Sequence, residues 1–318
     1  MYEIFTEKPE MAEKAMEAKF MPNTVLQFVI FVGVFVVAQV IQALLGGIIL
    51  VLTNLDNLGA FLNTTNEASL MNNSTFLLTS LFITVFVTIL AVIYCRFIER
   101  RSLYSMGFTK QNAFKQYFMG LFIGFVMFGA SILICMLTGT LKFNGYILSG
   151  GALIIVIFFL GFFFQGMSEE VLLRSYLMIS LTTKRSIMFA VIANSVIFSA
   201  MHLLNSGITA LSVVNLTLFG IFASLYTLRT NNIWGICAIH TMWNFVQGNI
   251  FGILVSGMSV GASVFSFTPT AEGSLINGGS FGLEGGLAVT IVLVASTALV
   301  IMLKRQKNEP TSIQEVGS

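Results

Sequence analysis

Residues 149–181 read SGGALIIVIFFLGFFFQGMSEEVLLRSYLMISL, and they decide the fold class. No charged residue occurs between Ser149 and Ser168, and a helix needs about 20 apolar residues to cross the hydrocarbon core of a bilayer. Two glutamates and an arginine then follow, while the residues around them stay apolar. The stretch therefore predicts a membrane-spanning helix that carries ionisable side chains within the membrane.

The composition of the whole chain agrees with this prediction. Apolar residues make up 56% of the 318 positions and charged residues only 9%, whereas a soluble domain carries about a quarter charged residues. Eight apolar runs lie at 24–53, 75–95, 116–138, 149–181, 187–205, 208–228, 233–253 and 285–303. We therefore expect an all-α, polytopic transmembrane helix bundle of about eight spans. Its membrane-embedded domain covers 24–303, between a cytoplasmic N-terminal segment, 1–23, and a cytoplasmic tail, 304–318.

The positions of Lys and Arg predict the orientation of these spans. If the N-terminus is cytoplasmic and the spans alternate, 14 of the 16 basic residues fall on the cytoplasmic side, as the positive-inside rule requires. We therefore expect an integral protein of the plasma membrane, in contact with the lipid bilayer, with both termini cytoplasmic. The net charge is only +2 and no basic cluster has stacking aromatic residues beside it, so we expect no nucleic-acid partner.

Ionisable residues inside the apolar runs are the main indication of function. A charge at the bilayer centre costs roughly 3 kcal/mol or more on insertion scales, so such residues are rarely incidental. Away from the ends of the runs, these groups occur only in the fourth, fifth and seventh runs. They are Glu169, Glu170 and Arg174 in the fourth run, His202 in the fifth, and His240 in the seventh, where the amide of Asn244 follows.

The two glutamates face different directions on a helix. Glu170 and Arg174 are four residues apart, with the acid first, which is the favourable order for a helical ion pair. Successive helical residues point about 100° apart, so Glu169 faces elsewhere and need not be neutralised by Arg174. One glutamate can therefore be structural while its neighbour stays available as a base.

The same spacing relates the two histidines to their neighbours. His240 and Asn244 share a helix face, and so do Phe198 and His202, which would place the Phe198 ring as a wall beside the imidazole. Each histidine alone is equally compatible with a simple helix-to-helix hydrogen bond. It is the occurrence of all these groups in three neighbouring spans that favours a site.

Depth in the membrane allows these groups to meet. Glu169 and His202 lie 16 and 17 residues from Arg185, on the two sides of the same cytoplasmic turn. At 1.5 Å per residue, both would lie roughly 25 Å from that turn.

Three motifs resemble those of a known family. They are Glu169-Glu170-x-x-x-Arg174, Phe198-x-x-x-His202 and His240-x-x-x-Asn244, in this order. They are similar to the three motifs of the CAAX protease and bacteriocin-processing (CPBP, or Abi) family of intramembrane proteases. Further similarities between the second and third motifs are Gly220, Leu225-Tyr226, Thr230 and Trp234. The likeness covers about 167–249, and Ser175 departs from it because many members have Gly there.

The resemblance implies hydrolysis of a peptide bond in a catalytic cavity within the bundle. Carried over residue by residue, it makes Glu169 the general base that activates water, with His202 helping to hold that water. His240 and Asn244 would bind the oxyanion of the tetrahedral intermediate. An imidazole N–H and an amide N–H are suitable donors for that charge.

The resemblance also assigns the supporting residues and raises the question of a metal. Glu170 and Arg174 would set the geometry of the site. Glu169, His202 and His240 could together form a zinc site with two histidines and one carboxylate, although no HExxH motif is present. We favour a metal-free reaction with no cofactor, because Glu169 cannot readily serve as both ligand and base.

Three functions are compatible with these observations. The first is an intramembrane endopeptidase acting on a peptide or membrane-anchored protein, such as a prenylated CAAX tail, a bacteriocin or signal-peptide precursor, or a membrane anchor. The second is a non-catalytic immunity or scaffold protein of the same fold. The third is a transporter with a Glu and His proton relay, for which paired broken helices are expected and not found. The intact motifs favour the endopeptidase.

The side of the membrane to which the site opens depends on the fourth helix. If that helix is unbroken, Glu169 and His202 lie in the outer half, under residues 254–284, which are rich in Gly and Ser and contain no Lys or Arg. This segment could then act as a mobile lid. If the helix instead breaks near Gly166, Glu169 moves towards the cytoplasm and away from His202. The unbroken helix is preferred because catalysis needs the two groups together.

Overall fold

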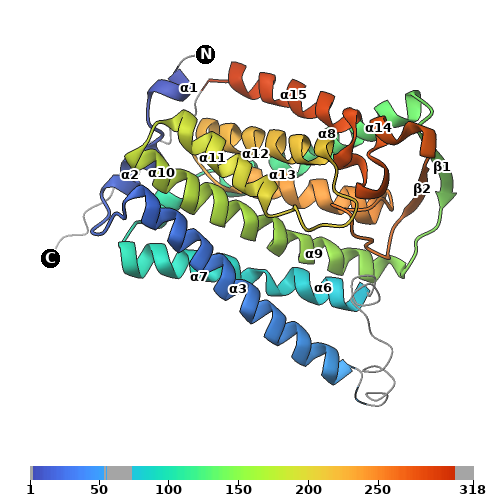
Figure 1. Cartoon of the computed structure of the whole chain (residues 1–318), viewed down its shortest axis with the longest axis horizontal. Helices are drawn as coiled ribbons and strands as arrows, with labels where there is room; N and C mark the ends of the chain where they lie inside the picture. Colours follow the sequence, from blue (N-terminus) through green and yellow to red (C-terminus); the bar gives the residue numbers. More distant parts are fainter. Residues whose placement is uncertain (1–2, 54, 56–73, 305–318) are drawn as a thin grey trace.

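The computed structural model describes residues 3–53, 55 and 74–304, and 74% of it is helical. The helices form one bundle with their axes mostly along its length (Figure 1). Strand structure in the described residues is confined to one pair, β1 (Leu141–Tyr146) and β2 (Phe265–Pro269). The predicted all-α helix bundle is therefore confirmed.

Within the described residues, five helices are long and apolar enough to cross a membrane. Three of them are regular: α3 (Thr24–Thr53), α8 (Ala113–Leu137) and α12 (Ala210–Thr230). The second span combines α6 (Ser74–Ile83), α7 (Val85–Ile93) and the π-helical η2 (Tyr94–Glu99). The fourth combines α9 (Gly151–Glu170), the π-helical η4 (Val171–Met178) and α10 (Ile179–Lys184).

Three shorter helices correspond to the other predicted spans. They are α11 (Ile187–Ala200), α13 (Trp234–Phe245) with the π-helical η5 (Val246–Ile250), and α15 (Leu287–Met302). The number of eight membrane crossings therefore stays a prediction. The predicted fifth span, 187–205, is too long, because α11 ends at Ala200 and turns follow.

Large apolar side chains cover the outside of the bundle. Val25 in α3 is 73% exposed, Phe114 in α8 is 83% exposed and Leu153 in α9 is 75% exposed. A soluble protein rarely exposes contiguous apolar surface of this kind. Lipid is the solvent that suits such an exterior, in agreement with an integral membrane protein.

The fourth helix is continuous from Gly151 to Lys184, so the break considered near Gly166 is absent. Gly166 has a different role, because a Cβ there would lie only 2.8 Å from the backbone nitrogen of Thr241. The glycine lets α9 and α13 approach closely. The departure from α-helical geometry comes later, in η4.

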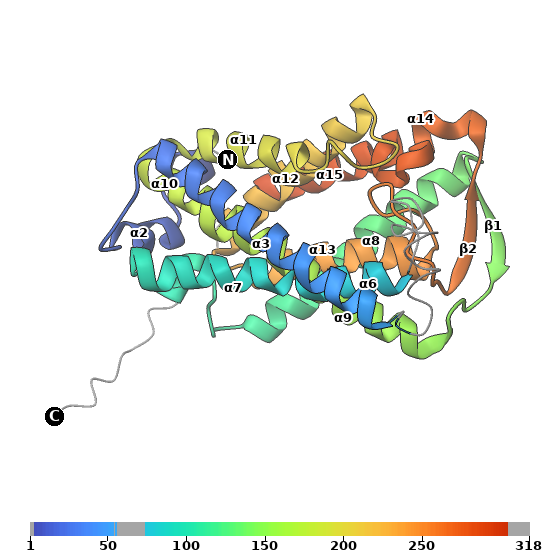
Figure 2. The same ribbon diagram turned by 60° about the horizontal axis from the view of Figure 1, so that its bottom comes forward.

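Helix α13 lies at the centre of the bundle, surrounded by α8, α9 and α12 (Figure 2). Two glycines of α8 bring it close: a Cβ on Gly120 would lie 2.2 Å from the carbonyl oxygen of Gly235, and one on Gly124 would lie 2.6 Å from that of Ile239. Small residues at helix interfaces are how membrane helices pack tightly. The core therefore surrounds the helix that carries His240.

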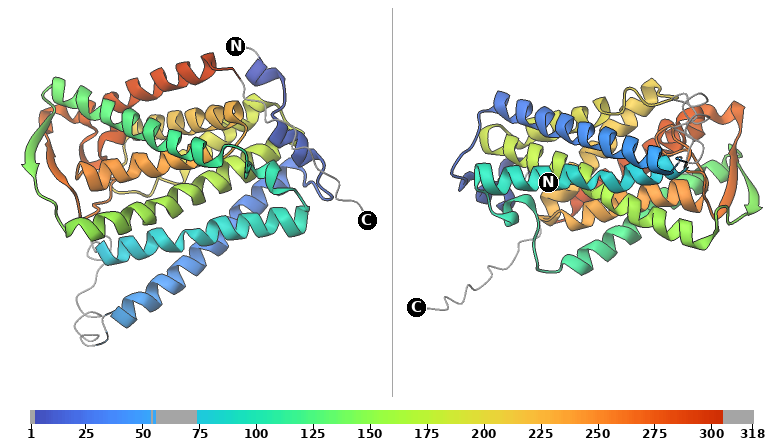
Figure 3. Two further views of the ribbon diagram at one scale, coloured as in Figure 1. Left: turned by 180° about the vertical axis from the view of Figure 1, so that it is seen from behind. Right: turned by 90° about the horizontal axis from the view of Figure 1, so that it is seen from below.

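The N-terminal segment folds against one end of the bundle as α1 (Glu3–Thr6) and α2 (Glu10–Met16). The backbone nitrogen of Met11 donates to Asn231 Oδ1 over 3.2 Å, at the turn between α12 and α13. At the same end, Arg229 Nη2 donates to the carbonyl oxygen of Ile301 near the end of α15, over 2.6 Å. Figure 3 shows α1 beside this end of α15. The first and last described helices thus meet at one end, as an even number of crossings requires. Apart from Lys304, the predicted tail lies outside the described residues.

The opposite end is covered by β1, β2 and the turns around α14 (Ser274–Asn277). The strands pair antiparallel, from Leu141 opposite Pro269 to Tyr146 opposite Phe265. Asn277 Nδ2 donates to the carbonyl oxygen of Thr140 over 2.8 Å, and this bond ties the segment to the end of α8. The segment predicted as a lid therefore packs on this end of the bundle.

Candidate active site

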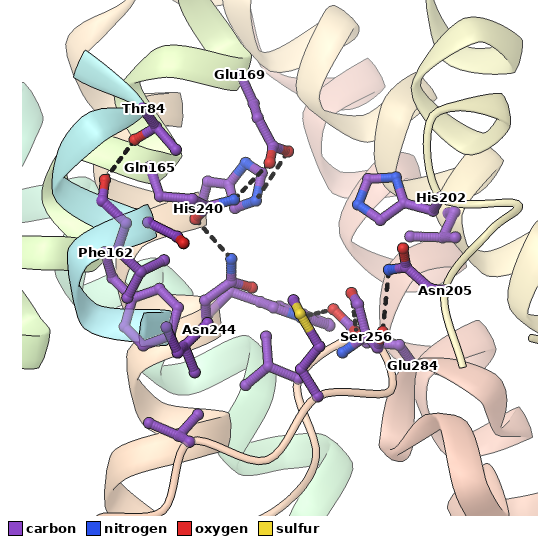
Figure 4. A pocket seen from close by; sticks show the side chains of 18 of the residues that line it. Thr84, Phe162, Gln165, Glu169, His202, Asn205, His240, Asn244, Ser256 and Glu284 are labelled. Atoms are coloured by element: carbon purple, nitrogen blue, oxygen red, sulfur yellow. Dashed lines mark hydrogen bonds and ion pairs between the residues drawn. The ribbon is translucent and has the colours of Figure 1, made fainter. Parts of the chain in front are cut away.

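A cavity of about 510 Å³ lies between α3 and α6 on one side and α11, α12 and α15 on the other, with α9 and α13 beside it. The four predicted catalytic residues all line it: Glu169, His202, His240 and Asn244. Figure 4 shows them around a common space. Most of the remaining lining is apolar, so polar interactions inside the cavity are poorly screened by water.

The two carboxylate oxygens of Glu169 have different surroundings. Oε1 accepts a hydrogen bond from Gln165 Nε2, one helical turn earlier in α9, over 2.6 Å. Oε2 has no hydrogen-bond partner among the described residues and lies 3.8 Å from His240 Nε2. One oxygen is therefore held by Gln165, while the other is buried beside His240 and has no hydrogen bond.

His240 is oriented by the second glutamate. Its Nδ1 lies 2.8 Å from Glu170 Oε1, and because an ionised carboxylate only accepts, Nδ1 carries the donated hydrogen. The same oxygen accepts from Arg174 Nη1 over 3.0 Å. Both members of this pair are fully buried, and His240 is 4% exposed. The Nε2 atom of His240 is thereby directed towards Glu169.

Arg174 connects this pair to the neighbouring helices. Its Nη2 donates to the carbonyl oxygen of Gly220 in α12 over 3.4 Å, and its Cζ lies 4.9 Å from the ring centroid of Phe198 in α11. The ion pair between Glu170 and Arg174 has the geometry that the sequence predicts. The bond from Glu170 to His240 was not predicted, because helical spacing relates only residues of one helix.

His202 lies in the turn that follows α11, so it is not inside a span as the sequence suggested. Its Nδ1 lies 2.9 Å from the carbonyl oxygen of Phe198, which can only accept, so Nδ1 carries the hydrogen. In the neutral imidazole, Nε2 is then an acceptor. The Phe198 ring lies 4.9 Å from the imidazole, as the spacing predicts. His202 faces the cavity from the side opposite Glu169 and His240 (Figure 4).

The turn that carries His202 is held by residues 254–284, which we call the covering segment. Asn205 Nδ2 donates to the carbonyl oxygen of Ser256 over 3.0 Å. Gly207 has a positive φ of 74°, which a side chain would disfavour, and a Cβ there would lie 2.5 Å from the carbonyl oxygen of Ser280. These tertiary contacts hold the turn that follows α11, which ends at Ala200 and not at residue 205 as predicted.

Asn244 lies on the same face of α13 as His240 and also reaches the cavity. Its Nδ2 donates to Gln165 Oε1 over 2.9 Å. Gln165 therefore joins Asn244 to Glu169, a connection that the sequence analysis missed because it considered mainly ionisable residues. The available signal was the four-residue spacing between Gln165 and Glu169.

An aromatic wall separates this site from the rest of the core. The ring of Phe219 lies 5.1 Å from that of His240 and 5.6 Å from that of Phe198. Trp243 lies 5.7 Å from Phe219. Phe219 and Trp243 were not predicted as site residues, because nothing in the sequence distinguishes them from the other aromatic residues of these spans.

A third carboxylate, Glu284, lines the cavity at a different side from Glu169 (Figure 4). Its Oε2 accepts from the backbone nitrogen and the hydroxyl of Ser256, each over 2.8 Å, and its Oε1 accepts from Trp243 Nε1 over 3.1 Å. These bonds attach the covering segment to α13. Glu284 was missed because it stands at the boundary of the last predicted span, where a charge is ordinary.

A zinc site would require Glu169, His202 and His240 to lie around one point. In the part of the chain that the structure describes, no group of three or more His, Cys, Asp or Glu side chains is placed to hold a metal ion. Glu169 and His240 lie together, while His202 faces them across the cavity. As they stand, the three residues do not fit a zinc ion.

The arrangement has the parts that hydrolysis needs. It offers a carboxylate oxygen without a hydrogen-bond partner, an imidazole acceptor on the facing side, an imidazole nitrogen 3.8 Å from that oxygen, and an amide that Gln165 links to the same carboxylate. A general base and fixed donors, placed in an apolar cavity, are suited to activating water and stabilising an oxyanion.

Comparison with known proteins supports this interpretation. The family model described as type II CAAX prenyl endopeptidase Rce1-like matches residues 151–246, from the start of α9 to the start of η5. This Rce1-like domain contains all seven predicted site residues, and it is consistent with a protease of the CPBP family. The resemblance seen in the three motifs is thereby confirmed. No curated protein and no solved structure matches the chain.

Proposed function

We propose that this protein is an intramembrane endopeptidase in which Glu169 activates the attacking water. The observation that carries the proposal is the position of Glu169, which lines the cavity and whose buried Oε2 has no hydrogen-bond partner among the described residues and lies 3.8 Å from His240 Nε2. The Rce1-like domain supports a protease of a CAAX-type intramembrane family. The substrate is a peptide or a membrane-anchored protein.

The first step is the attack of water on the peptide carbonyl. Glu169 Oε2 takes one proton from the water, while the Nε2 atom of His202 accepts a hydrogen bond from its other hydrogen. The water oxygen bonds to the carbonyl carbon, and the π electrons of the carbonyl move onto its oxygen. The result is a tetrahedral intermediate with a negatively charged oxygen.

Two nitrogens are placed to stabilise that charge. The amide of Asn244 has two hydrogens and commits one of them to Gln165, so the other can reach the oxyanion. His240 commits Nδ1–H to Glu170, so it donates from Nε2 in its protonated form, beside the carboxylates of Glu169 and Glu170. Such fixed donors are typically the largest contribution to catalysis of acyl transfer.

The second step releases the products. The carbonyl re-forms as the bond to the peptide nitrogen breaks, and Glu169 returns its proton to that nitrogen. The products are a peptide with a new carboxyl end and a peptide with a new amino end, and Glu169 is again ionised. No metal is needed for either step.

Glu170, Arg174 and Phe198 support the site, and of the three only Phe198 lines the cavity. Glu170 fixes the imidazole of His240, and Arg174 neutralises Glu170. Phe198 lies between the guanidinium of Arg174 and the imidazole of His202. The pair is buried completely, so its hydrogen bonds are needed to offset the desolvation of both charges.

We further propose that the site opens in the outer half of the membrane. The covering segment that lines the cavity with Val255, Ser256 and Glu284 belongs to the end of the bundle that carries β1 and β2. The helix from Gly151 to Lys184 is unbroken, which supports placing Glu169 away from the cytoplasmic turn. In this reading, residues 254–284 cover the site from outside.

The proposed function is tested by mapping peptide products. Membrane and secreted peptides would be compared between cells that express the wild type, Glu169→Ala or Glu272→Ala. Glu272 is an exposed glutamate in the covering segment and serves as a matched control. We expect a set of product peptides to disappear in Glu169→Ala and to persist in Glu272→Ala. Identical peptides in all three would instead favour a non-catalytic scaffold.

A further inference from the structure

Gln165 is an amide within an apolar stretch of α9, between Phe164 and Gly166. An amide in an apolar environment costs several kcal/mol unless it is hydrogen-bonded, so its partners indicate its role. Those partners are two residues of the candidate site that stand on different helices. Nε2 donates to Glu169 Oε1 over 2.6 Å, and Oε1 accepts from Asn244 Nδ2 over 2.9 Å.

The chemistry of the partners fixes the direction of this chain. An ionised carboxylate only accepts, so Gln165 must turn its NH₂ group towards Glu169. Its carbonyl oxygen is then the only group left for Asn244, which must present its own NH₂ group in return. The side chain of Asn244 therefore cannot flip without losing its bond, and its second N–H keeps one direction.

The same chain selects the reacting oxygen of Glu169. Because Gln165 occupies Oε1, the carboxylate turns Oε2 towards His240, and this oxygen has no hydrogen-bond partner among the described residues and lies 3.8 Å from His240 Nε2. Base and amide donor thus receive their orientation from one side chain. This would keep the proton-accepting atom and the oxyanion donor in a constant relative position.

We propose that Gln165 is a positioning residue for peptide hydrolysis, which orients Glu169 as base and Asn244 as oxyanion donor. The assignment rests on the proposed function. Gln165 acts through its two partners and takes no part in proton transfer. Its loss should slow the chemical step more than it weakens substrate binding, since a misplaced base and donor matter chiefly in the transition state.

A second glutamine provides a matched control for a purely structural amide. Gln27 in α3 is fully buried, and its Nε2 donates to the carbonyl oxygens of Ser180 and Pro22 over 3.0 and 3.1 Å. It joins helices as Gln165 does, but it does not line the cavity. Methionine matches glutamine in length and cannot make these bonds.

The test measures kcat and KM of purified wild type, Gln165→Met, Gln165→Glu and Gln27→Met with one product-mapped peptide, together with thermal unfolding. We expect Gln165→Met to lower kcat by about 10–100-fold with KM changed by less than about 3-fold. Gln165→Glu keeps the shape but places a second carboxylate against Glu169, so we expect at least the same loss. Gln27→Met should lower the unfolding temperature and leave kcat within about 3-fold.

A double-mutant cycle separates positioning from general support. If Gln165 acts through Asn244, the losses in Gln165→Met and Asn244→Ala should combine to less than their product. Full kcat in both Gln165 variants would overturn the assignment of Gln165 but not the proposed function. A loss of kcat in Gln27→Met as large as that in Gln165→Met would do the same. Absence of Glu169-dependent cleavage by the wild type would overturn the proposed function and this assignment with it. If Gln165→Met does not accumulate, Gln165→Glu decides by the same kinetic criteria.

Discussion

At the residue scale, a single carboxylate oxygen orients two side chains of the site. Glu170 Oε1 accepts from both His240 Nδ1 and Arg174 Nη1, so it links the proposed oxyanion donor to a buried cation. Glu169, the next residue, is turned to the cavity instead. The two glutamates should therefore respond differently to substitution.

Removal of the reacting groups should abolish cleavage without unfolding the protein. We expect Glu169→Ala to lower activity by about 10²–10⁴-fold, the usual range for a general acid–base group. His202→Ala should also stop cleavage, because the attacking water loses the acceptor that holds it. His240→Ala should cost about 10²–10³-fold or more, as for loss of an oxyanion donor. Each variant should still insert and accumulate, which immunoblotting of membranes would check alongside peptide cleavage. Full activity in Glu169→Ala would refute the assignment of the base.

Removal of either member of the buried pair should lower protein yield as well as activity. Glu170→Ala leaves Arg174 without its carboxylate, and Arg174→Ala leaves the carboxylate without its cation, in a site with no exposure. Breaking a buried pair in this way costs about 3–5 kcal/mol. The exposed pair of Lys14 and Glu17 is the control, since surface pairs contribute about 1 kcal/mol or less. Yield and thermal unfolding in detergent would measure the difference, and normal yield in both buried variants would contradict it.

Metal dependence can be decided on the purified protein. If Glu169 acts as a base without zinc, activity should survive prolonged chelation, and elemental analysis should find less than one zinc per chain. The reason is that Glu169 Oε2 cannot both bind a metal and take the proton of the attacking water. Loss of activity with a chelator, followed by recovery with added zinc, would reverse this expectation.

At the element scale, helical periodicity predicted contacts within helices and missed those made between them. The spacing was sufficient for the pair of Glu170 and Arg174 and for the tilted contact of the Phe198 ring with His202. It could not show that Glu170 reaches His240, because that bond depends on how α9 and α13 cross. Likewise, an apolar sequence continues past Ala200, but the helix does not.

Gly166 is another residue whose role depends on contacts between helices. As a sequence feature it suggested a kink, whereas in the fold it is the contact point of α9 and α13. It lies three residues before Glu169 and packs against Thr241, the residue that follows His240. Local propensity predicts flexibility at glycine, and only the packing shows which glycine is needed for close approach.

Gly166→Ala should therefore impair both stability and activity. The new Cβ would lie 2.8 Å from the Thr241 nitrogen, so the helices must separate, at a typical cost of about 1–3 kcal/mol. The separation would move Glu169 away from His240. Gly33→Ala in α3 is the matched control, because a Cβ there has no neighbour within 4 Å and alanine favours a helix by about 0.5–1 kcal/mol. Thermal unfolding and cleavage would be measured for both, and equal behaviour would contradict the packing argument.

At the scale of the whole molecule, the apolar runs predicted the bundle but not how its ends are closed. At one end, Ile4, Met11, Ala12 and Ala15 are completely buried beneath the helix turns. At the other, β1 and β2 pair over more than a hundred residues of intervening sequence. Such contacts involve short segments without a strong periodic pattern, so composition alone gives little indication of them.

Two helix turns at opposite ends of the bundle allow the predicted orientation to be tested. Ser206 lies in the exposed turn after His202, and Lys184 is exposed at the end of α10. Lys184 is preferable to Ser186 for substitution, because the Ser186 hydroxyl caps α11 by accepting from the backbone nitrogen of Phe189 over 3.2 Å. Cysteines at these two positions would report on the two sides of the membrane.

Single cysteines would be placed at Ser206 or Lys184 in a background without the three native cysteines, all of which are buried. A membrane-impermeant maleimide applied to intact cells should label the Ser206→Cys protein and not the Lys184→Cys protein. Both should be labelled after the cells are opened, which controls for access to the thiol. The expectation follows from the basic residues placed on the cytoplasmic side, since translocating them is unfavourable. Labelling of Lys184→Cys alone in intact cells would invert the topology and place the cavity opening on the cytoplasmic side.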